Sequence, residues 1–201
     1  MTYSSFTLET VLQTFHLEKA DIQGLFSEIE PIEPSAHLTA ALARNVPLAV
    51  AINTEKAKSE LIVADVLVEL REELEQRISL FSGVDFNVDS ESDLTGVCDF
   101  LISLSPWQQF VEAPVITLVE AKNDNLHSGL GQCVAEMVAA QRFNAEKGND
   151  IPRVYGVTTT GVMWQFLKLE GQTLHMDMDV HTIERCDKLL GILASMVAQQ
   201  A

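Results

Sequence analysis

Glu120 and Lys122 are separated by one residue and stand at the end of a strongly apolar segment, Val115–Val119. In a β-strand, residues i and i+2 face the same side, so these two charged side chains project together. Asp99 lies in the preceding segment, which has strand-like alternation. If the two segments pair as a hairpin, their backbones lie about 4.8 Å apart and Asp99 meets Glu120. The three side chains would then form one charged cluster.

A cluster of Asp99, Glu120 and Lys122 has the chemistry of a metal-dependent phosphate site. Two carboxylates that converge in a partly buried place repel each other unless a cation lies between them. Their oxygens, with the backbone carbonyl of Ala121 as a further ligand, suit Mg²⁺ or Mn²⁺. Lys122 would hold or help to deprotonate the attacking water, or neutralise charge in the transition state. The alternative is a group of strand-end charges that only faces water.

Three strands must place these groups. Ile78–Val88 and Gly96–Ser103 alternate between polar and apolar residues, and Val115–Lys122 follows with a continuous apolar run. Alternation predicts half-buried strands, and the continuous run predicts a central strand that is buried on both faces. Asp99 points to the same side as its apolar neighbours. We therefore expect a three-stranded meander that brings the charged cluster together.

Two helices flank this meander. Asn53–Arg77 carries an apolar stripe with Glu60 at its edge, and Leu126–Lys147 carries a face of small, apolar side chains suited to packing on a sheet. Glu60 is either a solvated flank of the first helix or a carboxylate of the site. Lys56, one turn earlier, either reaches a phosphate or forms an i,i+4 surface pair with Glu60.

The segments after the second helix complete an α/β protein. Strands are expected over Arg153–Thr158 and Val162–Leu169, with Leu174–Val180 as an edge strand and a final helix over His181–Gln199. The order of helix, three strands, helix, strands and helix predicts a mixed β-sheet flanked by helices.

The N-terminal part is predicted to be helical. Residues 5–26 have apolar spacing typical of a helix, residues 28–34 form an acidic connector broken by proline, and Ser35 caps a short helix through Asn45. We expect a helical appendage over residues 1–45 and a main domain over residues 46–201.

With its elements in this order, the pattern Asp99…Glu120-Ala121-Lys122 resembles the PD-(D/E)XK nuclease superfamily, whose fold is called restriction-endonuclease-like. The resemblance covers roughly residues 50–170. It implies a core of one helix, three strands, one helix and one strand. It also implies hydrolysis of phosphodiester bonds that depends on Mg²⁺ or Mn²⁺, with DNA as the expected substrate.

The resemblance implies roles for individual residues. Glu60 corresponds to a glutamate of the family's first helix, and Asp99 and Glu120 correspond to its metal-binding carboxylates. Gln132 matches a glutamine that many members carry early in the next helix, where it would orient the water or its neighbours. Cys98 stands where many members have a proline, which is the least constant part of the motif.

The chain is strongly acidic, with 13 basic and 29 acidic residues and a net charge of −16. This balance counts against a protein that coats nucleic acid and against one that binds membrane surfaces through a basic face. Residues 1–119 hold 6 basic and 19 acidic residues, whereas residues 120–201 hold 7 and 10. We therefore expect a less negative face beside the site, with weak and strongly salt-sensitive binding of DNA.

The cysteines and the apolar segments bear on the compartment. Cys98, Cys133 and Cys186 lie far apart without a C-x-x-C pair, which argues against a disulfide framework or a zinc knuckle. No basic signal sequence and no apolar run of membrane-spanning length is visible, so we expect a cytoplasmic protein in a reducing compartment. The N-terminal helices and the apolar last helix could serve a homodimer, in which two copies cut two strands.

Other interpretations stay open. His175, Asp177, Asp179 and His181 alternate with apolar residues and form either a transition-metal site or the wet face of an edge strand. The protein could also be a catalytically inactive, acidic interaction module of a larger complex, or an enzyme that acts on RNA or a nucleotide.

Overall fold

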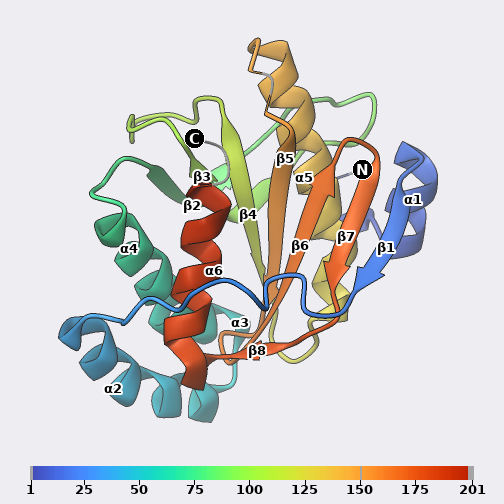
Figure 1. Ribbon diagram of the computed structural model, residues 1–201. Coiled ribbons are helices and arrows are strands. Elements are labelled where there is room, and N and C mark those ends of the chain that lie inside the picture. The colour runs from blue at the N-terminus through green and yellow to red at the C-terminus, as the bar shows by residue number, and fades with distance from the viewer. Residues whose placement is uncertain (1, 150, 199–201) are drawn as a thin grey trace.

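A computed structural model describes residues 2–149 and 151–198, and its eight strands form one mixed sheet (Figure 1). The strand order is β1-β7-β6-β5-β4-β3-β2, and β8 pairs with β6. The strands are β1 (Glu18–Ile22), β2 (Ser79–Asp85), β3 (Val97–Ser103), β4 (Val115–Ala121), β5 (Arg153–Thr159), β6 (Met163–Glu170), β7 (Thr173–Asp177) and β8 (His181–Thr182).

The three strands predicted as a meander are β2, β3 and β4, which are antiparallel to one another. Strand β5 runs parallel to β4, and helix α5 (His127–Glu146) makes the crossover between them, as a parallel connection requires. Strands β5, β6 and β7 are again antiparallel. The meander, the helix that follows it and the central position of β4 are therefore confirmed.

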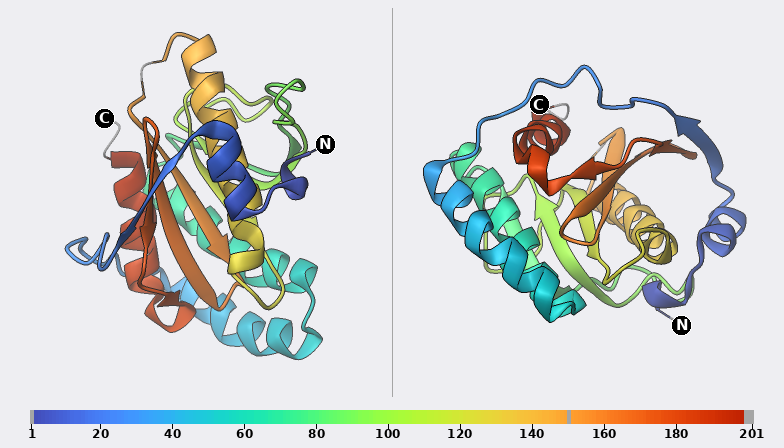
Figure 2. Two further views of the ribbon diagram at one scale, coloured as in Figure 1. Left: turned by 90° about the vertical axis from the view of Figure 1, so that its right-hand side faces the viewer. Right: turned by 90° about the horizontal axis from the view of Figure 1, so that it is seen from below.

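Helices cover both faces of the sheet (Figure 2). One face carries α2 (Ala36–Ile52), α6 (Cys186–Ala198) and a helical segment formed by α3 (Glu55–Lys58), the π-helical turn Ser59–Val63 and α4 (Ala64–Glu73). The other face carries α5, with the short 3-10 turn η1 (Tyr3–Ser5) and α1 (Leu8–Phe15) packed against it. Each face buries its own hydrophobic cluster, which holds the sheet between two helical layers.

The predicted helix over residues 5–26 is wrong. Thr7 caps α1, but His16 adopts a left-handed conformation with φ 55° and ends the helix. The chain then extends as β1, which pairs in parallel with β7, and the N–H of Glu18 donates to the carbonyl of Gln172 at 2.8 Å. The segment expected to be a helical appendage therefore contributes a strand to the sheet, and β7 is not the edge strand that was expected.

Two other helix boundaries differ from expectation. Ser35 caps α2 as predicted, with its Oγ accepting from the N–H of Leu38 at 3.1 Å, but the helix continues beyond Asn45 to Ile52. The final helix begins at Cys186 instead of His181, because His181 and Thr182 pair with β6 before a 3-10 turn. Its expected end at Gln199 lies outside the described residues.

The described helices include none that combines the length and the apolar character needed to cross a membrane. The longest of them, α5, holds polar and charged side chains among its buried residues.

Candidate active site

The register of β3 and β4 brings Asp99 and Glu120 together. Phe100 pairs with Val119 and Leu101 with Leu118, and the same register extended by one residue places Asp99 opposite Glu120. Side chains of directly opposed residues in an antiparallel pair point to the same face. Asp99 Oδ2 also accepts a hydrogen bond from the N–H of Ala121 at 2.9 Å, which fixes this carboxylate against the end of β4. The geometry expected for these two residues is present.

Glu120 is the most enclosed member of the cluster, with 1% of the residue exposed. Its Oε1 accepts a hydrogen bond from Lys122 Nζ, whereas its Oε2 has no hydrogen-bond partner within the described residues. Burial raises the pKa of Glu120 to about 8, and the negative charge of Asp99 adds to this, against the opposing effect of Lys122. An unpartnered, buried carboxylate oxygen next to a second carboxylate is a candidate ligand for a cation.

Lys122 completes the cluster from the turn that follows β4. Burial acts to lower the pKa of its ammonium group, but the charge and hydrogen bond of Glu120 together with the charges of Glu55 and Asp99 outweigh burial, so this pKa is raised. The side chain is 18% exposed and therefore reaches the surface from a largely enclosed position. Its backbone N–H donates to the carbonyl of Thr159 at 2.7 Å, which ties the turn to β5.

Glu60 belongs to the π-helical turn that packs on the face of the sheet opposite α5. Its contact differs from those of the three clustered residues. Its carboxylate is 2.8 Å from Lys56 Nζ and its side chain is 60% exposed, so the i,i+4 surface pair is what the structure shows. Both residues nevertheless line a pocket of about 260 Å³ that also includes Asp99. The pocket is lined by Glu55, Lys56, Ser59, Glu60, Ser82, Gly83, Asp99 and Ala121.

Helix α5 packs closely on the clustered residues. A Cβ added at Gly129 would lie 3.0 Å from Lys122 Cγ and 3.3 Å from Glu120 Cγ, so a glycine permits this approach. One turn further along, Gln132 is half-buried, and its Nε2 donates to Glu136 Oε1 at 3.1 Å. Gln132 therefore lies on the helix that covers the cluster, as the family resemblance implies.

Glu136 was missed at the sequence level. It is fully buried, and its Oε2 has no hydrogen-bond partner in the described part of the chain. Burial raises its pKa well above the usual value, and the charge of Glu120 adds to that shift. The available signal was a carboxylate four residues after Gln132, on the helix face otherwise formed by small and apolar side chains.

Lys58 is a second residue near the site that the spacing of residues in the sequence did not indicate. Its side chain is 8% exposed, and its Nζ donates to the carbonyl oxygen of Asn123 at 2.6 Å and to Asn53 Oδ1 at 2.8 Å. The ammonium group thereby links α3, the end of α2 and the turn that follows Lys122. These hydrogen bonds, with an ion pair to Asp124 Oδ1 at 3.4 Å, hold this turn beside the cluster.

Of the alternating histidines and aspartates, Asp177, Asp179 and His181 form a structural network. Asp177 is buried, and its Oδ1 accepts from the N–H of Leu25 at 3.3 Å and of Asp179 at 3.1 Å, while Oδ2 lies 3.1 Å from His181 Nε2. His175 instead lies 4.0 Å from a carboxylate oxygen of Glu170. Across residues 2–149 and 151–198, no three histidine, cysteine, aspartate or glutamate side chains are arranged to hold a metal ion. A metal at the proposed site would therefore rest on two carboxylates, a main-chain oxygen and water.

The three cysteines are free and buried, and burial raises the pKa of each thiol, to about 12 for Cys186. Thiols held in this state are poor nucleophiles. They therefore pack as small apolar side chains and offer no competing catalytic group.

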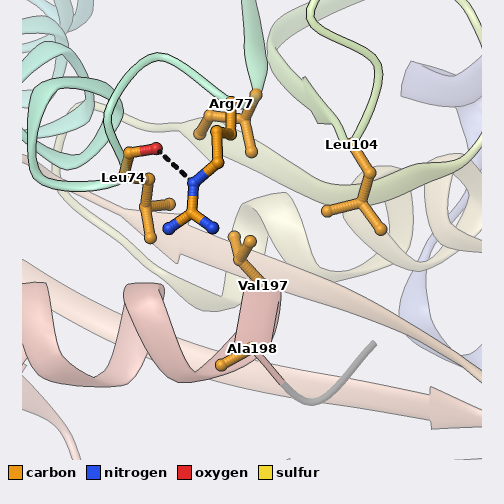
Figure 3. A pocket seen from close by; sticks show the side chains of 6 residues that line it. Leu74, Arg77, Leu104, Val197 and Ala198 are labelled. Atoms are coloured by element: carbon orange, nitrogen blue, oxygen red, sulfur yellow. Dashed lines mark hydrogen bonds between the residues drawn. The ribbon is translucent and has the colours of Figure 1, made fainter. Parts of the chain in front are cut away.

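A second pocket, of about 310 Å³, lies near the other end of β3. Figure 3 shows side chains that line it. It is lined by Leu74, Arg77, Ile78, Leu104, Val197 and Ala198. Leu104 follows the end of β3, whereas Asp99 is near its start, so the strand separates this pocket from the carboxylates. Its lining is apolar apart from Arg77, whose Nε donates to the carbonyl of Leu74 at 3.2 Å.

Comparison with known proteins adds no assignment. The chain matches no protein-family model, and no curated protein matches it in sequence.

Proposed function

We propose that this protein hydrolyses phosphodiester bonds, with DNA as the expected substrate, and that its sheet has the restriction-endonuclease-like fold. The observation that carries the proposal is the convergence of Asp99 and Glu120 across β3 and β4, with Lys122 on the same end of β4. A helix, the β2–β4 meander, α5 and β5 follow one another in the order that this fold requires.

The residues present fit a divalent cation of the Mg²⁺ type. The donor set is all oxygen: the carboxylates of Asp99 and Glu120 with the backbone carbonyl of Ala121. The unpartnered Oε2 of Glu120 supports this fit, because a cation would coordinate a buried oxygen that the protein itself leaves without a donor. When bound, Mg²⁺ or Mn²⁺ supplies Lewis-acid polarisation of the phosphate and acidifies water.

Each side chain of the site has its own role in this proposal. Asp99 and Glu120 hold the cation, and Lys122 holds the attacking water or neutralises charge that develops on the phosphate. Gln132 orients that water or its neighbours from α5. Glu60 and Lys56 line the outer pocket, where Lys56 would exchange its partner for a substrate phosphate.

The acidic composition limits how the substrate is held. With a net charge of −16, the chain repels a polyanion except where Lys122, Lys56 and a bound cation face it. If two phosphates are neutralised, affinity for DNA falls about tenfold between about 50 and 200 mM salt. Tight binding that is insensitive to salt would contradict this picture.

The test is nicking of supercoiled plasmid with Mg²⁺ or Mn²⁺, combined with calorimetric titration of the metal into the same samples. We compare the wild type with Asp99→Ala/Glu120→Ala and with Lys122→Met. Lys147→Met serves as the matched control, because Lys147 is an exposed lysine at the far end of α5. The proposal requires that the double variant lose metal binding and nicking, that Lys122→Met lose nicking alone, and that the control keep both.

The acidic surface also favours a second candidate, a catalytically inactive interaction module. That candidate requires a wild-type protein that binds no metal and cleaves neither DNA nor RNA oligonucleotides in any of the metals tested. Cleavage of RNA or of a nucleotide, with DNA left intact, would keep the site and change the substrate.

A further inference from the structure

Glu136 is a buried acid that the proposed mechanism does not use. No part of the residue is exposed, and its single hydrogen bond is the one that Oε1 accepts from Gln132 Nε2 at 3.1 Å, counting the described residues. A carboxyl group placed in such a position disfavours folding, so its presence points to a role that a leucine could not fill.

The surroundings of Glu136 hold it in place. On the outer side of α5, the N-terminal segment packs so closely that a Cβ at Gly131 would lie 2.3 Å from the carbonyl oxygen of Phe6. On the inner side, Cys133 and Met137 contact β5 at Gly156, where a Cβ would lie 2.9 and 2.4 Å from their sulfur atoms. Helix α5 is therefore clamped between the N-terminal segment and the sheet, and it presents Glu136 in a fixed position.

The contact with Glu136 determines how the Gln132 amide is oriented. A glutamine amide has a donor end, Nε2, and an acceptor end, Oε1. Because Glu136 takes the donor end, Oε1 is turned away from Glu136 and remains free to accept a hydrogen bond. Without that partner, the half-buried amide could also turn its donor end to the place where Oε1 now offers an acceptor.

We propose that Glu136 is a positioning residue that fixes the Gln132 amide with Oε1 as the acceptor for the attacking water. The inference deepens the proposed function and rests on it. Glu136 itself touches neither substrate nor metal, and it acts only through Gln132.

A double-mutant cycle on kcat tests this role. The proteins are the wild type, Gln132→Ala, Glu136→Leu and the double variant, assayed on a DNA oligonucleotide at saturating metal. Loss of a supporting contact of this kind lowers activity by about 10–100-fold. Glu136→Leu should lower kcat by such a factor with KM and metal affinity unchanged, and the double variant should be no slower than Gln132→Ala.

Glu136→Gln is the conservative variant. Its side-chain oxygen can still accept from Gln132 Nε2, but its own amide can also donate to Gln132 Oε1, so kcat should lie between those of the wild type and Glu136→Leu. Glu136→Leu should be at least as stable as the wild type at neutral pH, because it removes a buried carboxyl group. If Glu136 had only a structural role, Glu136→Leu would instead lose both stability and activity.

A spectroscopic readout keeps the inference testable if Glu136→Leu fails to fold. The Nε2 protons of Gln132, assigned by their loss in Gln132→Met, should resonate apart from those of free glutamines in the wild type and in Glu136→Gln. Averaged resonances in the wild type would overturn the inference. Multiplicative effects in the cycle, or unchanged kcat in Glu136→Leu, would overturn it while the wild type still cleaves. A wild type that does not cleave overturns the proposed function and this inference together.

Discussion

Replacing Glu120 by glutamine should stabilise the metal-free protein at alkaline pH and abolish the proposed cleavage. The folded state holds a proton on Glu120 up to about pH 8, whereas the unfolded chain releases it near its ordinary value of 4.5. Between pH 4.5 and about pH 8, the unfolded state releases this proton while the folded state keeps it. The free energy of unfolding of the wild type therefore falls as pH rises. Glutamine resembles the protonated acid and cannot ionise, so Glu120→Gln should not show this fall in the free energy of unfolding.

The magnitude follows from the displacement of the pKa. A tenfold change in a proton equilibrium corresponds to about 1.4 kcal/mol, so a pKa moved from 4.5 to about 8 destabilises the folded state by at most about 4 kcal/mol at pH 8. Relaxation of the site and entry of water reduce this value, and we expect about 2–4 kcal/mol. At pH 4.5 or below, wild type and Glu120→Gln should differ by less than about 1 kcal/mol.

The assay is urea unfolding in EDTA at pH 4.5, 6.5 and 8, followed by tryptophan fluorescence. Trp164 is fully buried in β6 and reports on the core. Glu146→Gln is the control, because Glu146 is an exposed glutamate at the end of α5 and should follow the wild type at every pH. Added Mg²⁺ should restore the wild type at pH 8 and leave Glu120→Gln unchanged. Parallel pH profiles for wild type and Glu120→Gln would refute the electrostatic reasoning.

Three further substitutions test how the site is supported. Asn144→Leu should lower the free energy of unfolding by about 2–4 kcal/mol, because the buried Asn144 amide pairs with both the N–H and the carbonyl of Val115, at 2.8 and 2.7 Å. Urea unfolding measures this, and a loss below about 1 kcal/mol would contradict it. Gly131→Ala should cost about 1–3 kcal/mol and expose the N-terminal segment to proteolysis, because the added Cβ meets the carbonyl oxygen of Phe6. An unchanged proteolytic pattern would show that this segment does not depend on the close approach. Lys58→Met should destabilise by about 1–3 kcal/mol and speed hydrogen exchange in the turn after β4, where the ammonium group donates to a backbone carbonyl. Unaltered exchange in that turn would count against the anchoring role.

Local pattern was sufficient for much of the fold. The continuous apolar run Val115–Val119 predicts a strand buried on both faces, and β4 is buried along its whole length. The small, apolar face of the segment Leu126–Lys147 predicts a helix on the sheet, and α5 spans His127–Glu146. Patterns of this kind depend on neighbours within a few residues, which the chain carries wherever it folds.

The candidate site was partly predictable for the same reason. Alternation indicated that Glu120 and Lys122 share a face, and it left the meeting of Asp99 with Glu120 to depend on hairpin pairing, which the observed register of β3 and β4 provides. The surface pair of Lys56 and Glu60 follows from helical spacing alone. The metal, the reaction and the role of Gln132 remain predictions that the geometry supports.

Only the tertiary structure decided which residues surround these groups. Residues 18–22 form β1 because β7, far away in the chain, offers them a parallel partner, and their local spacing had indicated a helix. Glu136 and Lys58 are buried because segments distant in sequence pack over them: α5 is clamped by the N-terminal segment, and the turn at Asn123 reaches Lys58. Periodicity reports which side of an element a residue lies on. The burial and hydrogen bonding of a charged group depend on what the rest of the chain brings to that side, and so they are properties of the assembled fold.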